Sequence, residues 1–385
     1  MRIILPVFVK NCLKTITDAG YEAYVVGGAV RSVLLGKTPN DYDITTSAHA
    51  EVIQKLFKKT VPTGLKHGTV TVVISGKNIE VTTYRTDGDY ADNRHPSNVN
   101  FVSSLNEDLK RRDFTVNAIA YNETSGLIDL FGGIEDLKNG ILRTVGIPRD
   151  RFCEDALRIL RCYRFACQLN FEIEKETEKA AVMLSHLLKN ISAERIFLEL
   201  KKVFLSDNPQ RINRLFETDF FVKLFGKKAI IDCSVLETDK NFSKRFSVFC
   251  FKNKIDTKAV LKALKADNLT VKNTEFYYKV LSVKAAENPI QLKKYVEFIA
   301  PENLIDAFLF RSELFDDENL KYAKEIIKNK EPYRTDMLDI NGGEIKNSGF
   351  SGADIGNKLK TLLEICIEHP ENNKNDILNK FIKKL

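Results

Sequence analysis

The sequence predicts an α+β protein in which an N-terminal α/β head is followed by an all-α remainder. Short β-rich runs alternate with helical ones up to about residue 145. From Arg151 onward, apolar residues recur at helical spacing, with Lys and Glu on the outer faces. With 385 residues, of which 43% are hydrophobic, the chain is long enough for two to four domains.

Individual elements follow from local patterns, because β-branched and aromatic residues favour strands and a period of 3.6 favours helices. The strand-like runs are YEAYVVGG (21–28), DYDITT (41–46), GTVTVVISG (68–76), NIEVTTYR (78–85), FTVNAIAYN (114–122) and GLIDLFGG (126–133). The clearest helical runs are EDALRILRCYRFACQL (154–169), ERIFLELKKVFL (194–205) and DIGNKLKTLLEICIEH (354–369).

Composition narrows the class of protein. The net charge of +7 suits an acidic partner such as nucleic acid. The seven cysteines form no CxxC pair, so neither a zinc site nor a disulfide framework is indicated, and we expect a cytoplasmic protein. No apolar run approaches the roughly 18 residues of a membrane span, so we expect no membrane partner.

Two aspartates in one strand-like run are the first candidate site residues. Residues two apart share a face of a strand, so Asp41 and Asp43 are expected to point the same way. Divalent cations would relieve their repulsion, and Mg²⁺ binds one or two carboxylates together with substrate phosphate oxygens. The alternative is a solvated turn with two surface acids.

Two features flank these aspartates in the sequence. Gly27 and Gly28 precede a helix expected over about 29–35, whose free backbone N–H groups would suit phosphate, although a double glycine is also common in simple turns. Glu80 is a third candidate acid in a strand-like run, where the alternative is a surface strand residue.

The run 154–169 is predicted to be one helix with an apolar stripe. That stripe comprises Ala156, Ile159, Leu160, Tyr163, Ala166 and Cys167. Asp155 and Arg158 lie near one another off the stripe, and Arg161 lies with Glu154 and Arg158 on the opposite side. A carboxylate accepts and a guanidinium donates, so the pair Asp155 and Arg158 matches the amino group and ring nitrogen of cytosine or adenine. The alternative is an ordinary surface ion pair.

These residues resemble a known family. GG, VR, LLG and DxD at this spacing resemble motif A of the nucleotidyltransferase superfamily, and specifically of class II tRNA nucleotidyltransferases (CCA-adding enzymes) and bacterial poly(A) polymerases. The resemblance continues through HGTV (67–70), RRDFTVNAIA (111–120), DLFGG (129–133), EDALRILR (154–161), ISAERI (191–196) and SGADIGNKL (351–359). One position departs from the family pattern, because Ser32 stands where the family usually has Asp.

The resemblance implies a nucleotidyltransferase head with a mixed sheet, followed by helical neck, body and tail. The implied domains are a catalytic head (1–145), a base-recognising neck (146–205), a body (206–330) and a tRNA-binding tail (331–385). The implied catalytic residues are Asp41, Asp43 and Glu80, with Mg²⁺ on Asp41 and Asp43. The implied nucleotide-binding residues are Gly27, Gly28, Arg31, Arg112, Asp113, Asn117, Asp155, Arg158 and Arg161. Arg112 and Asp113 would contact the ribose, with a structural salt bridge as the alternative.

The implied reaction is template-independent addition of CCA to the 3′ end of tRNA from CTP and ATP. A poly(A) polymerase, a CC-adding or A-adding specialist and a non-catalytic RNA-binding protein are the alternatives. The polar segment between Arg85 and Arg111 is expected to be a loop, and in the family such a loop is needed for the switch from CTP to ATP. The sequence leaves open whether the chain is a monomer or a homodimer.

Overall fold

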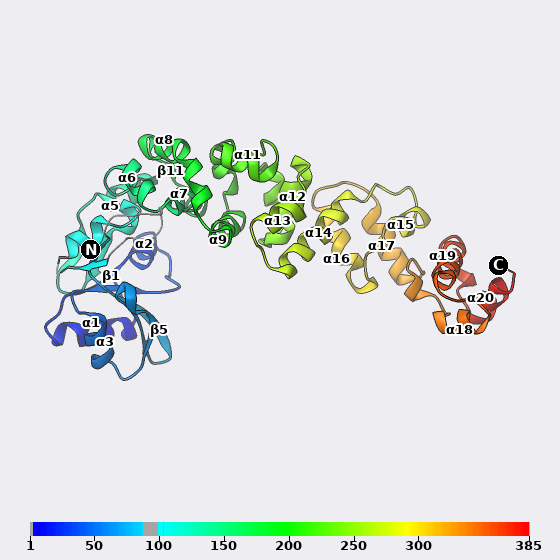
Figure 1. Cartoon of the computed structure of the whole chain (residues 1–385), viewed down its shortest axis with the longest axis horizontal. Coiled ribbons are helices and arrows are strands. Elements are labelled where there is room, and N and C mark those ends of the chain that lie inside the picture. Colours follow the sequence, from blue (N-terminus) through cyan, green and yellow to red (C-terminus); the bar gives the residue numbers. More distant parts are fainter. Residues whose placement is uncertain (1–2, 88–98, 103, 385) are drawn as a thin grey trace. The chain divides into compact units, whose positions relative to one another are not determined.

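The computed structural model describes residues 3–87, 99–102 and 104–384. Its contacts divide the chain into two compact units, which are described separately here. Unit 1 comprises residues 1–231 and 260–266, and unit 2 comprises residues 232–259 and 267–385. Figure 1 shows the strands at the N-terminal end of the sequence and the long series of helices that follows them.

Within its described residues, unit 1 contains one mixed sheet of seven strands, in the order β3-β4-β5-β2-β1-β8-β9. These strands are β1 (Ala23–Val26), β2 (Asp43–Thr46), β3 (Thr60–Gly64), β4 (Thr69–Ile74), β5 (Lys77–Thr83), β8 (Ile119–Asn122) and β9 (Gly126–Asp129). Strands β2 and β5 are parallel, whereas the other neighbours are antiparallel. The predicted mixed sheet is therefore confirmed.

Helices cover the sheet and hold the ends of its strands. Helices α1 (Val7–Asp18) and α3 (Ala50–Leu56) contact each other and the sheet, while α2 (Gly28–Leu34) packs against β1 and β8 (Figure 1). The central strands are apolar where they face these helices, and Val25, Ile44 and Val81 are at most 1% exposed. The burial of these side chains fixes the strand positions from which the site residues project.

The segment between Arg85 and Arg111 is more regular at its ends than predicted. Strands β6 (Arg85–Asp87) and β7 (Val99–Phe101) form an antiparallel pair, and α4 (Leu105–Lys110) follows. The prediction of a loop is therefore wrong for these three stretches. Residues 88–98 and 103, on which the expected switch from CTP to ATP depends, lie outside the described residues.

The rest of unit 1 is mainly helical, as the sequence predicted, with two short strands. Its further elements are α5 (Gly133–Asn139), β10 (Ile141–Leu142), α6 (Pro148–Glu154), α7 (Leu157–Leu169), β11 (Glu172–Ile173), α8 (Lys175–Met183), α9 (Ala193–Phe204), α10 (Asn213–Phe216) and α11 (Asp219–Phe225). The short strand β11 pairs with β10 in parallel. The short 3₁₀ helix η2 (Thr115–Asn117) precedes β8 and carries several site residues.

The prediction of one continuous helix over 154–169 is wrong at its start. Helix α6 ends at Glu154 and α7 begins at Leu157. Asp155 is extended, with φ −134° and ψ 103°, and its Oδ1 accepts a hydrogen bond from the N–H of Leu157 at 3.0 Å. The short side chain of Asp competes in this way with helical hydrogen bonding. The predicted apolar stripe is nevertheless buried in full.

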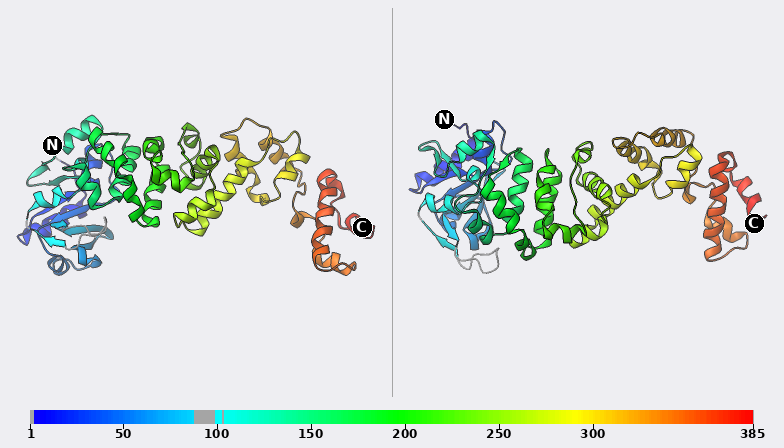
Figure 2. Two further views of the ribbon diagram at one scale, coloured as in Figure 1. Left: turned by 45° about the horizontal axis from the view of Figure 1, so that its top comes forward. Right: turned by 90° about the horizontal axis from the view of Figure 1, so that it is seen from above.

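The regular elements of unit 2 are all helical among residues 232–259 and 267–384 (Figure 2). They include α12 (Phe242–Asn253), α14 (Asn268–Ser282), α15 (Pro289–Tyr295), α16 (Pro301–Ser312), α17 (Asn319–Lys328), α18 (Gly342–Asn347), α19 (Ala353–Glu368) and α20 (Asn375–Ile382). Helix α13 (Thr257–Ala263) has residues in both units. No helix in the described part of the chain has the length and apolar character needed to cross a membrane.

Candidate active site

Three carboxylates meet where β2 begins. Asp43 is the first residue of β2 and lies opposite Glu80 in the parallel pairing with β5. Asp41 lies just before the strand, so the prediction that both aspartates lie within it is wrong. The predicted shared face still holds, because Tyr42 is buried whereas Asp41 and Asp43 are exposed. The three acids therefore form one group at this point of the sheet.

Within the described part of the chain, none of the three acids forms an ion pair. Although Asp43 is accessible to solvent, protein atoms surround it on several sides. This loss of water raises the pKa of Asp43 to about 6, and the charges of Asp41 and Glu80 add to the shift, while Arg112 opposes it. No group of three or more His, Cys, Asp or Glu side chains in the described residues is arranged to hold a metal ion. A cation here would need further oxygen ligands, such as those of a substrate.

Gly27 brings the backbone close to two of these charged side chains. Its φ of +70° lies in the left-handed region that glycine adopts without strain. A Cβ at this position would lie 3.4 Å from Nη1 of Arg112 and 3.9 Å from Oδ2 of Asp43. Gly27 precedes α2, which begins at Gly28, one residue earlier than the predicted Ala29. The double glycine thus lines the same site as the acids.

A chain of polar contacts links Arg31 to α7. Nη1 of Arg31 donates to Oδ1 of Asn117, whose Nδ2 donates to Oδ1 of Asp113 at 3.0 Å. Oδ2 of Asp113 accepts from Nε and Nη2 of Arg161 at 2.9 and 2.5 Å. Burial alone would favour the neutral acid, but Arg161 and Asn117 hold the pKa of Asp113 well below its usual range. Asn117 therefore orients Arg31 in this chain, where residue 32 is Ser.

The arginine and aspartate of the RRDF motif have different partners. Arg112 donates through Nη2 to Oδ2 of the buried Asp108 at 3.2 Å, while its own Nε is buried without an acceptor among the described residues. Asp113 is 8% exposed and accepts from Asn117, Arg161 and the N–H of Phe114. The structural salt bridge is therefore present at Asp113, although with Arg161 rather than with a neighbouring arginine.

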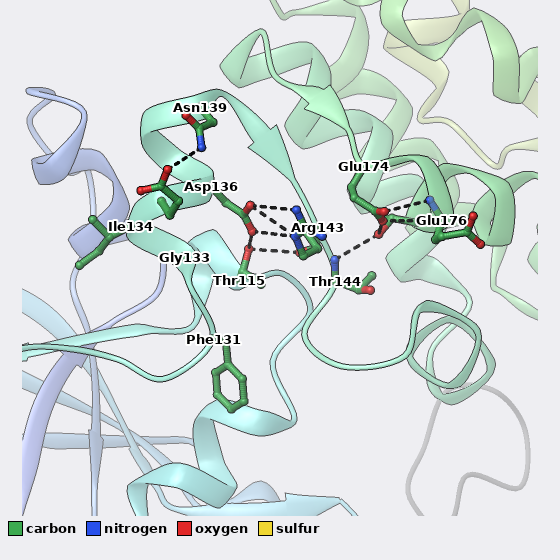
Figure 3. Close-up of polar contacts among 12 residues, drawn as sticks. Thr115, Phe131, Gly133, Ile134, Asp136, Asn139, Arg143, Thr144, Glu174 and Glu176 are labelled. Atoms are coloured by element: carbon green, nitrogen blue, oxygen red, sulfur yellow. Dashed lines mark hydrogen bonds and ion pairs between the residues drawn. The ribbon is translucent and has the colours of Figure 1, made fainter.

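The 3₁₀ helix η2 is supported by α5, and Figure 3 shows Thr115 of η2 beside Asp136 of α5. Asp129 accepts from the N–H groups of Gly133 and Ile134, at 2.8 Å each, at the start of α5. Asp136 accepts from Oγ1 of Thr115 at 2.6 Å and from Arg143. In this way α5 holds η2, the turn on which Asn117 lies.

Asp155 and Arg158 lie one turn apart at the junction of α6 and α7, where the N–H of Arg158 donates to the carbonyl oxygen of Asp155 at 2.9 Å, but their side chains have other partners. Oδ2 of Asp155 accepts from Nη2 of Arg195 at 3.2 Å. Arg158 is 9% exposed and donates to Oε2 of Glu154 at 2.7 Å and to the carbonyl oxygen of Arg111 at 3.0 Å. The alternative of a simple surface ion pair between these two residues is therefore not realised among the described residues.

Sequence reasoning missed three residues that organise this site. Arg195, on α9, holds Asp155, and the only sequence signal for it was its place in the ISAERI segment. Arg164 forms a buried ion pair with Glu199 of α9, in which both side chains are at most 8% exposed. Phe165 lies beneath the guanidinium groups of Arg31, Arg161 and Arg164. A single arginine or phenylalanine on an amphipathic helix has no pattern that distinguishes it from a surface or core residue.

Two protein-family models match the chain. Residues 23–143 match the model described as "Poly A polymerase head domain". Residues 170–229 match the model described as "Probable RNA and SrmB-binding site of polymerase A". The first match contains the three acids and the RRDF motif, so the site lies partly in a domain that other proteins share.

Curated proteins and solved structures give longer matches. The chain is 36% identical to a CCA-adding enzyme of Lactobacillus helveticus over 98% of each chain. It is 44% identical to a CCA-adding enzyme of Ligilactobacillus salivarius over 74% of this chain and 67% of the relative. Among solved structures, the chain is similar to the crystal structure of the Bacillus stearothermophilus CCA-adding enzyme in complex with CTP. The match has a TM-score of 0.80 and 29% identity, and it spans 99% of this chain and 98% of the other.

Proposed function

This chain belongs to the family of CCA-adding enzymes, and we propose on that premise that it adds C, C and A to the 3′ end of tRNA. The nucleotides come from CTP and ATP, and each addition releases pyrophosphate. The observation that carries this proposal is the match to a curated CCA-adding enzyme along almost the entire length of both chains. The head alone does not distinguish CCA addition from poly(A) synthesis, because its family model is named for poly(A) polymerases.

Asp41 and Asp43 are the residues that would hold divalent metal ions, and we propose Mg²⁺ as the ion. Two carboxylates with a neighbouring third acid suit a hard cation that takes its other ligands from substrate phosphates. The raised pKa of Asp43 supports this fit, since besides burial it reflects the negative charges of Asp41 and Glu80, which Arg112 offsets only in part. When bound, Mg²⁺ supplies polarisation of the phosphate oxygens and acidification of the attacking hydroxyl. Glu80 adds negative charge beside Asp43 and keeps the site selective for cations.

The triphosphate lies, in this proposal, between the glycines and Arg31. Gly27 and Gly28 leave room for a phosphate near the backbone, and Arg31 supplies a positive charge oriented by Asn117. Arg112 contacts the ribose through Nη1, the guanidinium nitrogen that lies beside Gly27, since Nη2 donates to Asp108 and Nε is buried. Asp113 already accepts two hydrogen bonds on each oxygen, so its expected contact with a ribose hydroxyl requires Asn117 or Arg161 to release it.

Base selection is assigned to Asp155 and Arg158. Asp155 accepts from the exocyclic amino group and Arg158 donates to the ring nitrogen, which matches cytosine and adenine. Uracil and guanine present a carbonyl and an N–H at the two positions, so buried groups would remain unpaired. Arg195 and Glu154 hold the two side chains, and Arg161 supports the neighbouring turn through Asp113. Because protein side chains select the base in this proposal, the reaction needs no nucleic-acid template.

The compartment we propose is the cytoplasm, where tRNA ends are completed and thiols stay reduced. None of the seven cysteines forms a disulfide among the described residues, and five of them are buried. Cys12, Cys162, Cys167, Cys250 and Cys366 are the buried ones.

The test uses the full-length protein and tRNA that lacks its three terminal nucleotides. The tRNA is incubated with Mg²⁺ and with CTP, ATP or both, and the 3′ end is sequenced. We expect CC with CTP alone and CCA with both nucleotides. A long A tail would identify a poly(A) polymerase, a product stopping at CC or starting only from CC would identify a specialist, and an unchanged end would contradict the enzymatic assignment.

A further inference from the structure

Phe165 is a buried aromatic residue that contacts three guanidinium groups. We propose that it is a positioning residue, which holds Arg31 in the orientation that binds the phosphates of the incoming nucleotide. The ring lies on α7 and is 6% exposed. The Cζ atoms of Arg31, Arg161 and Arg164 lie 4.8, 5.4 and 3.8 Å from its centroid. This inference rests on the proposed function, because it concerns the same nucleotide site.

Arg31 has few other contacts that could fix its orientation. Asn117 accepts from Nη1, and Nε is buried without an acceptor among the described residues. No carboxylate of those residues lies within ion-pair distance of Arg31, and the next residue in the chain is Ser32 rather than an acid. The face of the Phe165 ring is therefore its second contact, and it attracts a cation through the ring quadrupole.

The orientation of the ring is itself fixed. Phe114 packs edge-on against Phe165, with 5.7 Å between centroids and 80° between planes. Phe114 is fully buried beside Asp113 in the RRDF motif. Phe114 of the RRDF motif therefore fixes the orientation of the Phe165 ring, which in turn contacts Arg31.

The balance of charge around the ring leaves Arg31 available to an anion. Arg161 is paired with Asp113, and Arg164 is paired with Glu199. Arg31 is the member of this group of three that has no carboxylate partner among the described residues. Burial lowers the pKa of Arg31 to about 10; Asp113 opposes this shift, and the charges of Arg164 and Arg161 add to it. A triphosphate would supply the missing negative charge, and the ring keeps the guanidinium in place before it arrives.

The first test replaces Phe165 with phenylalanines that carry one, two or three fluorines on the ring. Fluorine withdraws electron density from the ring face while changing the size of the side chain little, so the attraction for Arg31 weakens stepwise. We expect KM for CTP and ATP to rise with each fluorine, by about 3- to 10-fold at three fluorines, with kcat and the melting temperature nearly unchanged.

The matched control is the same series at Phe152. This side chain is also fully buried, on α6, and no cation lies over its ring among the described residues. We expect a flat KM at this position. If KM for CTP and ATP did not change with fluorination at Phe165, the inference would be wrong. The proposed function is tested separately in the same assay, by the activity of the unmodified protein.

The second test asks whether Phe165 acts through Arg31 rather than through Arg161 or Arg164. Nucleotide binding is compared for Phe165→Leu, Arg31→Lys and the double variant. If the ring acts through Arg31, Phe165→Leu weakens binding by a clearly smaller factor in the Arg31→Lys background than in the wild type. If Phe165→Leu weakened nucleotide binding by the same factor in the wild type and in Arg31→Lys, Phe165 would not act through Arg31.

Discussion

Asp43 is accessible to solvent and lies near two further carboxylates, those of Asp41 and Glu80. We predict that Asp43→Asn lowers kcat for both CMP and AMP transfer by more than about 100-fold, because the amide no longer offers a charged ligand for a cation. Affinity for tRNA should hardly change. Asp18→Asn, on the exposed end of α1, is the control and should retain wild-type rates. If Asp43→Asn turned over as fast as Asp18→Asn, the assignment of Asp43 as a metal ligand would be wrong.

Asp155 serves both the fold and, in our proposal, base selection. Asp155→Asn keeps an oxygen that can accept from the N–H of Leu157, so the start of α7 should be preserved. The amide can also donate to the O4 carbonyl of uracil, so we predict that the preference for CTP over UTP falls by about 5- to 150-fold. The measurement is kcat/KM for each nucleotide, with thermal melting as the folding control. Asp150→Asn, an exposed acid on α6, should leave the preference intact.

The sequence predicted the position of a single site residue only where the residues next to it in the chain formed a recognisable pattern. The spacing of Asp41 and Asp43 predicted their common side, and the strand-like run around Glu80 predicted that it lies in a strand. The pairing of that strand, β5, with β2 became visible only in the structure. The partners of Asp155 and Arg31 could not be predicted in this way. They are Arg195 and Asn117, which lie 40 and 86 residues away and are brought close only by packing.

Among the elements, α5 and η2 approach one another unusually closely at Gly133. A Cβ on this residue would lie 2.2 Å from the carbonyl oxygen of Thr115, a distance that real Cβ atoms do not show. We predict that Gly133→Ala destabilises unit 1 by about 1–3 kcal/mol and lowers nucleotide affinity, because η2 carries Asn117. Urea denaturation and KM for CTP measure the two effects.

Gly356→Ala is a suitable control for this substitution. Gly356 lies inside α19, and a Cβ there would meet no atom within 4 Å. Alanine favours a helix interior over glycine by roughly 0.8–1 kcal/mol, so this variant should be at least as stable as the wild type. A Gly133→Ala variant as stable and active as Gly356→Ala would show that α5 and η2 can move apart without cost.

Two features that sequence patterns missed depend on local details of the chain. Strand β3 contains Pro62, which usually argues against a strand, but β3 lies at the edge of the sheet, where a missing N–H is tolerated. The break between α6 and α7 is set by one side chain of Asp155, whereas the helical period continues through it. Periodicity predicts that a segment is buried on one face, and local hydrogen bonds decide where an element begins.

For the whole molecule, the net charge of +7 predicts a strong effect of salt on tRNA binding. Each phosphate that the protein neutralises releases condensed counterions, so affinity falls as salt rises. We predict that raising KCl from about 50 to about 200 mM weakens tRNA binding by at least about tenfold. KM for CTP, measured with saturating tRNA, should change much less. Equal sensitivity of both constants would mean that the nucleotide site, rather than the tRNA surface, dominates the effect.

The contacts that support the site also set the order in which it forms during protein synthesis. Arg31 depends on Asn117, 86 residues later, and Asp113 depends on Arg161, 48 residues later. A growing chain that has released the three acids but not α7 from the ribosome has neither Phe165 nor Arg161 to hold the arginine and the turn. Nascent chains should therefore begin to bind CTP only after α7 has emerged from the ribosome.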